Sequence, residues 1–329
     1  MSADLASLLG AVTRWAGFVG ALLVTGAVVF RYSLLPGYRR AGGAALPGAL
    51  EGAAAAGVAA ALLLAIAAPI RLYAQALGFV EPGEAVTREI LATILRETAW
   101  GRGWVLQLLG AALAAAGFLA ARALPRHGWI MAAGGATAVI LAAPLTGHAT
   151  ASDRAGSWGY PLDVIHLLGA GAWLGTLAVL VIAGFPAASG VTDGRDGRAG
   201  HDGTGERDLR AGPTGGIPPV TLLVRAFSPI ALAGAGTAIG AGVILAFRYL
   251  EGSITALWTT SYGLMLFRKL VVLAAILLLG AVNWRVITPR LDQPGGPARI
   301  RRSSVLELLL GTVLLVVTAL LVSTGMPGE

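Results

Sequence analysis

Residues 52–72 read GAAAAGVAAALLLAIAAPIRL, an apolar run that carries a charge only at Arg71. About 20 apolar residues is the length that an α-helix needs to cross roughly 30 Å of hydrocarbon. The apolar residues do not alternate with polar ones, so the pattern is not that of a membrane β-barrel. This stretch therefore predicts a membrane-spanning helix.

The rest of the chain repeats this pattern. Similar apolar runs lie at about 8–30, 103–121, 129–146, 161–185, 224–250, 264–287 and 304–323. Over all 329 residues 56% are hydrophobic and only 12% are charged, which is unlike a soluble domain of this length. We therefore expect an all-α polytopic membrane helix bundle with about eight transmembrane helices. It should form a single integral membrane domain over residues 1–329, with the lipid bilayer as its surroundings.

Two polar segments interrupt the apolar runs. Residues 81–102 mix acidic and basic residues, and Val86, Ile90 and Ile94 recur at helical spacing, which favours an amphipathic helix on the membrane surface. Residues 187–219 are rich in Gly, Asp and Arg and contain few apolar side chains. Such a segment buries too little to offset its ordering entropy, so we predict a disordered cytoplasmic loop there.

The basic residues predict the orientation of the bundle. If the N-terminus is outside, the inner connections carry most of the 24 Lys and Arg residues: Arg31, Arg39, Arg40, Arg122, Arg126, Arg195, Arg198, Arg207, Arg210, Arg225, Arg285, Arg290, Arg299, Arg301 and Arg302. The positive-inside rule then places both termini outside. The net charge of +7 is therefore a topology signal and does not indicate binding to nucleic acid.

A candidate site lies in residues 144–175, PLTGHATASDRAGSWGYPLDVIHLLGAGAWLG. His148 ends the fourth apolar run, and a short loop joins it to the fifth, which carries Asp163 and His166 one helical turn apart. On a shared helical face the carboxylate can accept a hydrogen bond from one imidazole nitrogen and leave the other free for a metal. Trp173 lies two turns further on. The predicted site is open to the outer side.

A structural interpretation of the same residues is that His148 contacts interfacial water and that His166 only ties helices together. Two histidines and a carboxylate in one outer layer favour a metal site with His148 and His166 as ligands and Asp163 in support. The chain has no cysteine, so a soft ligand would have to be a thioether. Met265 and Met326 are the candidates on the outer side, although each alone is more typical of packing.

Several other polar and small residues lie within the apolar runs. Lys269, beside Arg268, can pair with Asp163 or extend to lipid headgroups, and Glu307 can pair with a loop arginine. Asn283 and Gln107 are typical of hydrogen bonds between helices. Two pairs of glycines have the spacing of close helix packing: Gly171 with Gly175, and Gly236 with Gly240.

The chain also resembles the copper resistance protein D (CopD) family of bacterial inner-membrane proteins over about residues 145–290. The resemblance is carried by Gly147-His148-Ala149, Asp163, His166-Leu167-Leu168, Trp173-Leu174-Gly175, Phe227-Ser228-Pro229-Ile230-Ala231-Leu232, Tyr262-Gly263, Leu266, Lys269 and Asn283. It implies a multi-pass protein of the bacterial cytoplasmic membrane that transports or handles copper. A periplasmic copper carrier is an implied partner, and the oligomeric state is left open.

Three classes of function remain open at the level of the sequence. The first is copper transport or delivery through His148 and His166, which the resemblance favours. The second is a membrane protein that binds haem b with the same histidines as axial ligands. The third is a non-catalytic assembly subunit in which both histidines are structural. A nucleotide-binding loop, a nucleophile elbow and a soluble catalytic domain are all missing from the sequence, so we do not expect an enzyme.

Overall fold

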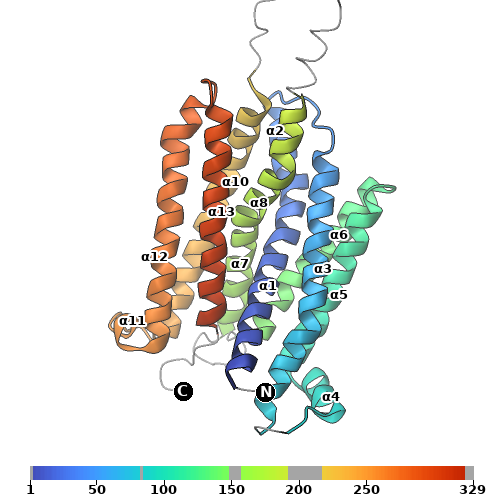
Figure 1. The fold of residues 1–329 in the computed structure, drawn as a ribbon, viewed down its shortest axis with the longest axis vertical. Helices are drawn as coiled ribbons and strands as arrows, with labels where there is room; N and C mark the ends of the chain where they lie inside the picture. Colours follow the sequence, from blue (N-terminus) through green and yellow to red (C-terminus); the bar gives the residue numbers. More distant parts are fainter. Residues whose placement is uncertain (1–2, 82–83, 148–156, 192–216, 323–329) are drawn as a thin grey trace, which may run out of the picture.

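The computed structural model describes residues 3–81, 84–147, 157–191 and 217–322, and it is a bundle of long helices (Figure 1). In these ranges eight helical segments are long and apolar enough to cross a membrane. The predicted all-α bundle of eight spans is therefore confirmed. No strand occurs in the described part of the chain.

The eight spans follow one another along the chain, and several contain short π- or 3-10-helical turns. Their bounds are α1 (Ala3–Val29) with η1 (Phe30–Leu34) and α2 (Leu35–Arg40); α3 (Ala49–Ala76) with η2 (Leu77–Phe79); α5 (Ala99–Ala120); α6 (Pro125–Ala142) with η3 (Pro144–Thr146); α7 (Gly159–Ala170), η6 (Gly171–Gly175), α8 (Thr176–Val179) and η7 (Leu180–Gly184); α10 (Pro219–Tyr249); α12 (Ser261–Val282) with η8 (Asn283–Ile287) and η9 (Thr288–Arg290); and α13 (Gly296–Leu321).

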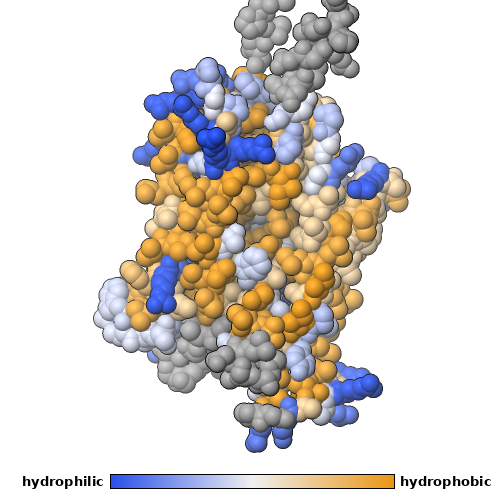
Figure 2. All heavy atoms as spheres, viewed as in Figure 1, coloured by the Kyte–Doolittle hydropathy of each residue, from blue (hydrophilic) through white to orange (hydrophobic). Residues whose placement is uncertain are grey.

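The surface of the bundle fits a bilayer. In Figure 2 the middle of the helices is apolar, and hydrophilic residues gather at the two ends. Large apolar side chains such as Ile66, Leu232 and Leu278 are more than 60% exposed in the middle of their helices. In water this exposure would be costly, so the apolar band is the surface that faces lipid.

The two ends of the bundle differ in their residues. α1 begins and α13 finishes at the same end, which we call the outer end in keeping with the predicted orientation (Figure 1). The opposite, inner end carries α2, with Arg39 and Arg40, and the start of α13, with Arg299, Arg301 and Arg302. The even number of spans agrees with termini on one side.

The helices extend beyond the apolar runs that predicted them. The eighth span begins at Gly296 instead of about 304, because Arg299, Arg301 and Arg302 continue the helix past the hydrocarbon. The fifth span continues to Val191, past the expected end at 185. Of the predicted disordered loop at 187–219, residues 192–216 lie outside the described part of the chain, and the prediction stands untested.

The polar stretch before α5 forms α4 (Arg88–Glu97), as its periodicity predicts. Thr87 caps this helix, since its hydroxyl accepts a hydrogen bond from the Ile90 amide at 3.4 Å. The backbone amide of Glu89 and the Thr87 hydroxyl also hold the pKa of the Glu89 carboxyl below its usual value. On the opposite face Ile94 is buried against the bundle, which gives α4 one apolar and one polar side.

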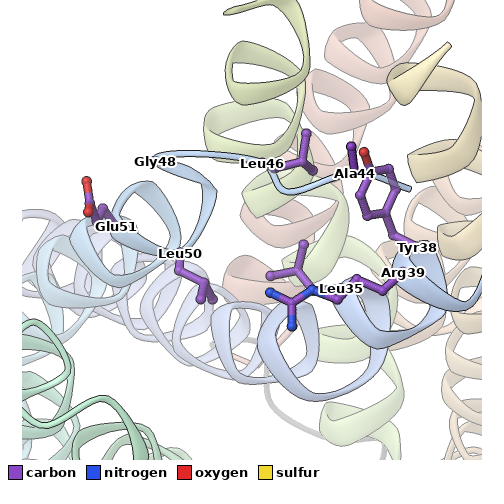
Figure 3. A pocket seen from close by; sticks show the side chains of 8 residues that line it. All are labelled: Leu35, Tyr38, Arg39, Ala44, Leu46, Gly48, Leu50 and Glu51. Carbon is purple, nitrogen blue, oxygen red and sulfur yellow. The ribbon is translucent and has the colours of Figure 1, made fainter. Parts of the chain in front are cut away.

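At the inner end, the turn between α2 and α3 encloses a cavity of about 210 Å³ (Figure 3). Gly42 and Gly48 take φ values of +88° and +78°, the left-handed region that glycine enters without strain. Among the residues that line this cavity, Leu35 and Tyr38 are buried, whereas Arg39 and Glu51 are exposed. The two opposite charges form no ion pair, so the cavity is a feature of the turn and not a charged site.

The first span crosses the fifth through glycines. A Cβ atom at Gly175 would lie 1.9 Å from the Leu22 carbonyl oxygen, and one at Gly26 would lie 2.1 Å from the Gly175 carbonyl carbon. The two backbones are therefore in direct contact, which only glycine permits. A Cβ at Gly236 or Gly240 would meet nothing within 4 Å, so the second predicted packing pair contacts no other described part of the chain.

Candidate functional site

Asp163 and His166 lie on successive turns of α7, close to the outer end of the bundle. Both side chains are half-buried. His166 Nδ1 lies 2.7 Å from the backbone carbonyl oxygen of Ala238 on α10. A carbonyl oxygen can only accept, so Nδ1 carries the proton and donates it to this bond. The remaining ring nitrogen, Nε2, is then the one with a lone pair to offer.

The position of the imidazole is set by α10. A Cβ atom added to Gly242 would lie 3.1 Å from both Cε1 and Nδ1 of His166, so the ring packs directly over this glycine. Further along the same interface, a Cβ at Gly169 would lie 2.6 Å from the Gly234 carbonyl oxygen. Close backbone contact between α7 and α10 thus brings the Ala238 carbonyl within reach of the ring.

The orienting hydrogen bond of His166 differs from the one expected. The helical spacing predicts that Asp163 can accept this bond, but no hydrogen bond joins Asp163 and His166, and the partner is Ala238. A backbone carbonyl fixes a metal-ligating histidine as well as a carboxylate does. Asp163 is therefore a separate carboxyl group, one helical turn from His166.

Three further polar side chains surround Asp163. Lys269 on α12 lies within electrostatic range of both Asp163 and His166. Tyr249 at the end of α10 and Tyr262 at the start of α12 are electrostatically coupled to the same carboxylate. The two tyrosine rings meet edge to face, with centroids 6.4 Å apart. Three spans therefore enclose one polar cluster in the outer half of the bundle.

Met265 lies beside this cluster, but its sulfur is engaged. It packs against the apolar residues around Tyr249 and Tyr262. Its Sδ atom accepts a hydrogen bond from Arg268 Nη1 at 3.3 Å. Met265 would have to release Arg268 before it could bind a soft cation. His148 and Met326, the other predicted ligands, lie outside the described residues.

The chain that leads to His148 is anchored by Arg71 of α3. Its Nη2 donates to the Thr146 carbonyl oxygen at 2.9 Å, and its Nη1 donates to Gln107 Oε1 of α5 at 3.4 Å. The guanidinium also lies 5.7 Å from the centre of the Trp100 ring. Gln107 thus makes the interhelical contact predicted for it. The last described turn before His148 is fixed to two other spans.

We expect Arg71→Met to loosen this anchor. The substitution keeps most of the apolar stem but leaves the Thr146 carbonyl and the Gln107 amide oxygen without their donor, at a cost of about 1–3 kcal/mol. Because the chain has no cysteine, the substitution Gly147→Cys introduces a single thiol that a maleimide can label in the folded protein. It is combined with each of the arginine variants. Labelling should be faster in Arg71→Met than in the exposed control Arg88→Met. Equal rates in both would contradict the anchoring role.

Trp173 does not join the cluster around His166. It lies in the π-helical turn η6, and its Nε1 donates to Glu307 Oε1 at 3.3 Å. Asn283 Nδ2 donates to the other carboxylate oxygen at 3.2 Å, and Ser303 Oγ donates to Asn283 Oδ1. The expected pairing of Glu307 with a loop arginine is therefore wrong. A second polar cluster lies deeper in the bundle, away from the predicted site.

The described residues contain no group of three or more His, Asp or Glu side chains arranged to hold a metal. His166 and Asp163 supply two donors in the outer half. A metal site would need a further donor, and the predicted ligand His148 lies outside the described ranges. The fold and this cluster thus define a class: a helical membrane protein with a half-buried histidine and carboxylate at its outer face.

Comparison with protein families identifies the group. Residues 3–159 match the model described as "Copper resistance protein D-like, N-terminal domain", and residues 222–321 match "Copper resistance protein D". Together the two matches cover most of the chain, which belongs to the copper resistance protein D family. It is accordingly a multi-pass inner-membrane protein of a copper-resistance family. Neither the curated proteins nor the solved structures gave a match.

The matched ranges differ from the region of resemblance. That region, 145–290, overlaps the end of the first match and most of the second. The first four spans, which resemble the family mainly in hydropathy, lie inside the N-terminal match. Residues 160–221, which include Asp163 and His166, lie in neither match. The assignment of these two residues therefore depends on their geometry.

Proposed function

We propose that the chain moves copper across the membrane through a site in its outer half, with His148 and His166 as ligands. Membership in a copper-resistance family supports copper as the substrate. Imidazole nitrogen is a suitable copper ligand, and without cysteine the chain offers no thiolate alternative. The site is reached from the outer side, and copper is cargo that binds and leaves.

The observation that carries this proposal is the bond between His166 and Ala238. Here Nδ1 is held at 2.7 Å by a carbonyl, and Nε2 is left on a ring that lies one turn from Asp163. A fixed ring with one free nitrogen is the arrangement found in metal-binding histidines.

Asp163 and Lys269 supply the charges that such a site needs. A carboxylate in this layer attracts a cation and stabilises it after binding. Lys269 is coupled to both Asp163 and His166, so in the empty site the ammonium group balances the carboxylate. An arriving copper ion takes over that role, and the two cations repel one another. In this proposal Lys269 keeps bound copper from becoming trapped.

The full-length protein reconstituted in liposomes tests the proposal. We expect copper, added outside as Cu(I) or Cu(II), to accumulate inside vesicles that contain the protein and not in empty vesicles. Elemental analysis of the washed vesicles measures the accumulated metal. Accumulation that does not differ from empty vesicles would contradict transport. An intense Soret band in the purified protein would favour haem at the same histidines instead.

A further inference from the structure

The second polar cluster, around Glu307, has no part in the proposed copper site. Glu307 lies on α13, 11 residues after Gly296, and only 6% of its surface is exposed. Its neighbour Asn283 is 8% exposed, and Trp173 is 5% exposed. A buried carboxyl group within a membrane span is costly and marks a functional site by default.

The partners of Glu307 are all neutral. Trp173 Nε1 donates to one carboxylate oxygen and Asn283 Nδ2 to the other. Indole nitrogen can only donate, so these contacts suit a carboxylate and offer nothing to a metal ion. Trp173 lies in the π-helical turn η6 and reaches α13 through its hydrogen bond to Glu307. The cluster is thus built around an acid group, with two N–H donors aimed at its oxygens.

The described part of the chain supplies no cation to balance this carboxylate. Within it no ion pair involves Glu307, and no charged side chain is electrostatically coupled to it. Charged residues do lie on α13 and on the elements packed against it, but none of them is among the printed partners of Glu307. They are Arg14 on α1, Arg31 on η1, Arg268 and Lys269 on α12, Arg285 on η8, and Arg299, Arg301 and Arg302 on α13. A buried anion in hydrocarbon is unfavourable, and a small mobile cation such as a proton would neutralise it.

A cavity gives such a cation access. About 400 Å³ of space lies between the fifth span, α10, α12 and α13, and Glu307 lines it. Most of the lining is apolar, but its polar members lie on the side of the inner end: Ser228, Asn283, Thr288 and Ser304. Ser304 is one turn before Glu307 on α13, and Thr288 donates a hydrogen bond to the Asn283 carbonyl at 2.9 Å. Gly280 leaves room beside Glu307, since a Cβ there would lie 3.9 Å from Oε1.

We propose that Glu307 is a proton-binding site, loaded from the inner end through this cavity, and that its proton is exchanged as copper crosses the bundle. In the loading step a hydronium ion in the cavity gives its proton to a Glu307 oxygen, leaving neutral water and a carboxylic acid. Release reverses the step. Trp173 and Asn283 stabilise the carboxylate form, and the apolar lining stabilises the neutral acid. The exchange with copper rests on the proposed copper transport, whereas proton binding does not.

Infrared spectroscopy of the purified protein tests proton binding directly. Between about pH 4 and pH 10, the range over which perturbed carboxyl groups titrate, we expect a buried carboxyl C=O stretch that appears as the pH falls. Asp163 is a second carboxyl group within the spans, so these spectra are recorded with Asp163→Asn as the background. In that background Glu307→Gln should lose the band, and Glu307→Asp should restore a titrating band. Trp173→Phe should shift its frequency, because one N–H donor is lost. The exposed residue Glu97 supplies the matched control, Glu97→Gln, which should keep the band.

Transport in liposomes tests the exchange. We expect an imposed pH gradient to change the rate of copper accumulation several-fold for the unaltered protein and for Glu97→Gln. Glu307→Gln should transport copper at a rate that no longer responds to the gradient.

A carboxyl band that does not titrate, or one that persists in Glu307→Gln, would overturn the proton site and leave the copper proposal intact. Equal responses of Glu307→Gln and the unaltered protein would overturn the exchange. If the unaltered protein accumulated no copper, the proposed function would fail, and the infrared result would still decide the proton site.

Discussion

His166→Ala should lower the affinity of the purified protein for copper by about 100-fold or more. Loss of a residue that merely orients a ligand costs 10- to 100-fold in metal affinity, so loss of the ligand itself should cost at least the upper end of that range. The substitution removes the imidazole that the Ala238 carbonyl holds at 2.7 Å. Equilibrium dialysis followed by elemental analysis measures the change, and copper accumulation in liposomes should fall in parallel.

The chain supplies a matched control in His127. This histidine is exposed at the start of α6, at the other end of that span from the connection that carries His148. His127→Ala should therefore leave copper affinity and transport unchanged. His148→Ala should resemble His166→Ala, because the proposal gives both rings to one ion. Copper bound with unchanged stoichiometry and affinity in both outer-end variants would show that the ligands lie elsewhere.

The sequence was sufficient to predict the architecture, because hydrophobic length is a direct physical requirement of the bilayer. Each apolar run of about 20 residues became a span, and the amphipathic period of 88–97 became α4. The positions of the helix ends were harder to predict from the sequence. The eighth span begins at Gly296 because charged residues continue a helix readily once it has left the hydrocarbon. Hydropathy locates the segment that crosses the hydrocarbon, but it does not locate the residue at which the helix begins or ends.

Side-chain partners could be predicted only within one helix. The spacing of Asp163 and His166 predicts that they lie on adjacent turns of one helix, and both do lie on adjacent turns of α7. It could not show that the Ala238 carbonyl, 72 positions away, would take the ring proton, since this depends on how closely α7 and α10 approach. The contact of Trp173 with Glu307 joins positions even farther apart in the sequence. A lone acidic residue in an apolar run was the available signal for that cluster.

The glycine pairs also show that the sequence does not reveal which residues meet across two helices. They lead to the second large expected effect. Gly175 and Gly240 look alike in sequence, each four residues after another glycine. Only Gly175 lies against another backbone, where a Cβ would be 1.9 Å from the Leu22 carbonyl oxygen. Because a backbone carbonyl cannot rotate away as a flexible side chain can, Gly175→Ala must push α1 from η6. Overpacking of this kind typically costs 1–3 kcal/mol, and we expect about 3 kcal/mol or more here.

Fluorescence-detected thermal unfolding of the purified protein in detergent measures this effect. Gly175→Ala should unfold well below the unaltered protein, and Gly26→Ala should behave in the same way, since its Cβ would meet Gly175 from the opposite helix. Gly240→Ala is the control, with open space around its Cβ. It should be neutral or slightly stabilising, because alanine favours the helix by up to about 1 kcal/mol over glycine. The comparison of the two variants separates the cost of close packing from the effect of helix propensity. If Gly240→Ala lowered the unfolding temperature as much as Gly175→Ala, the α10 face that carries Gly240 would have to contact a further surface, such as a second copy of the chain.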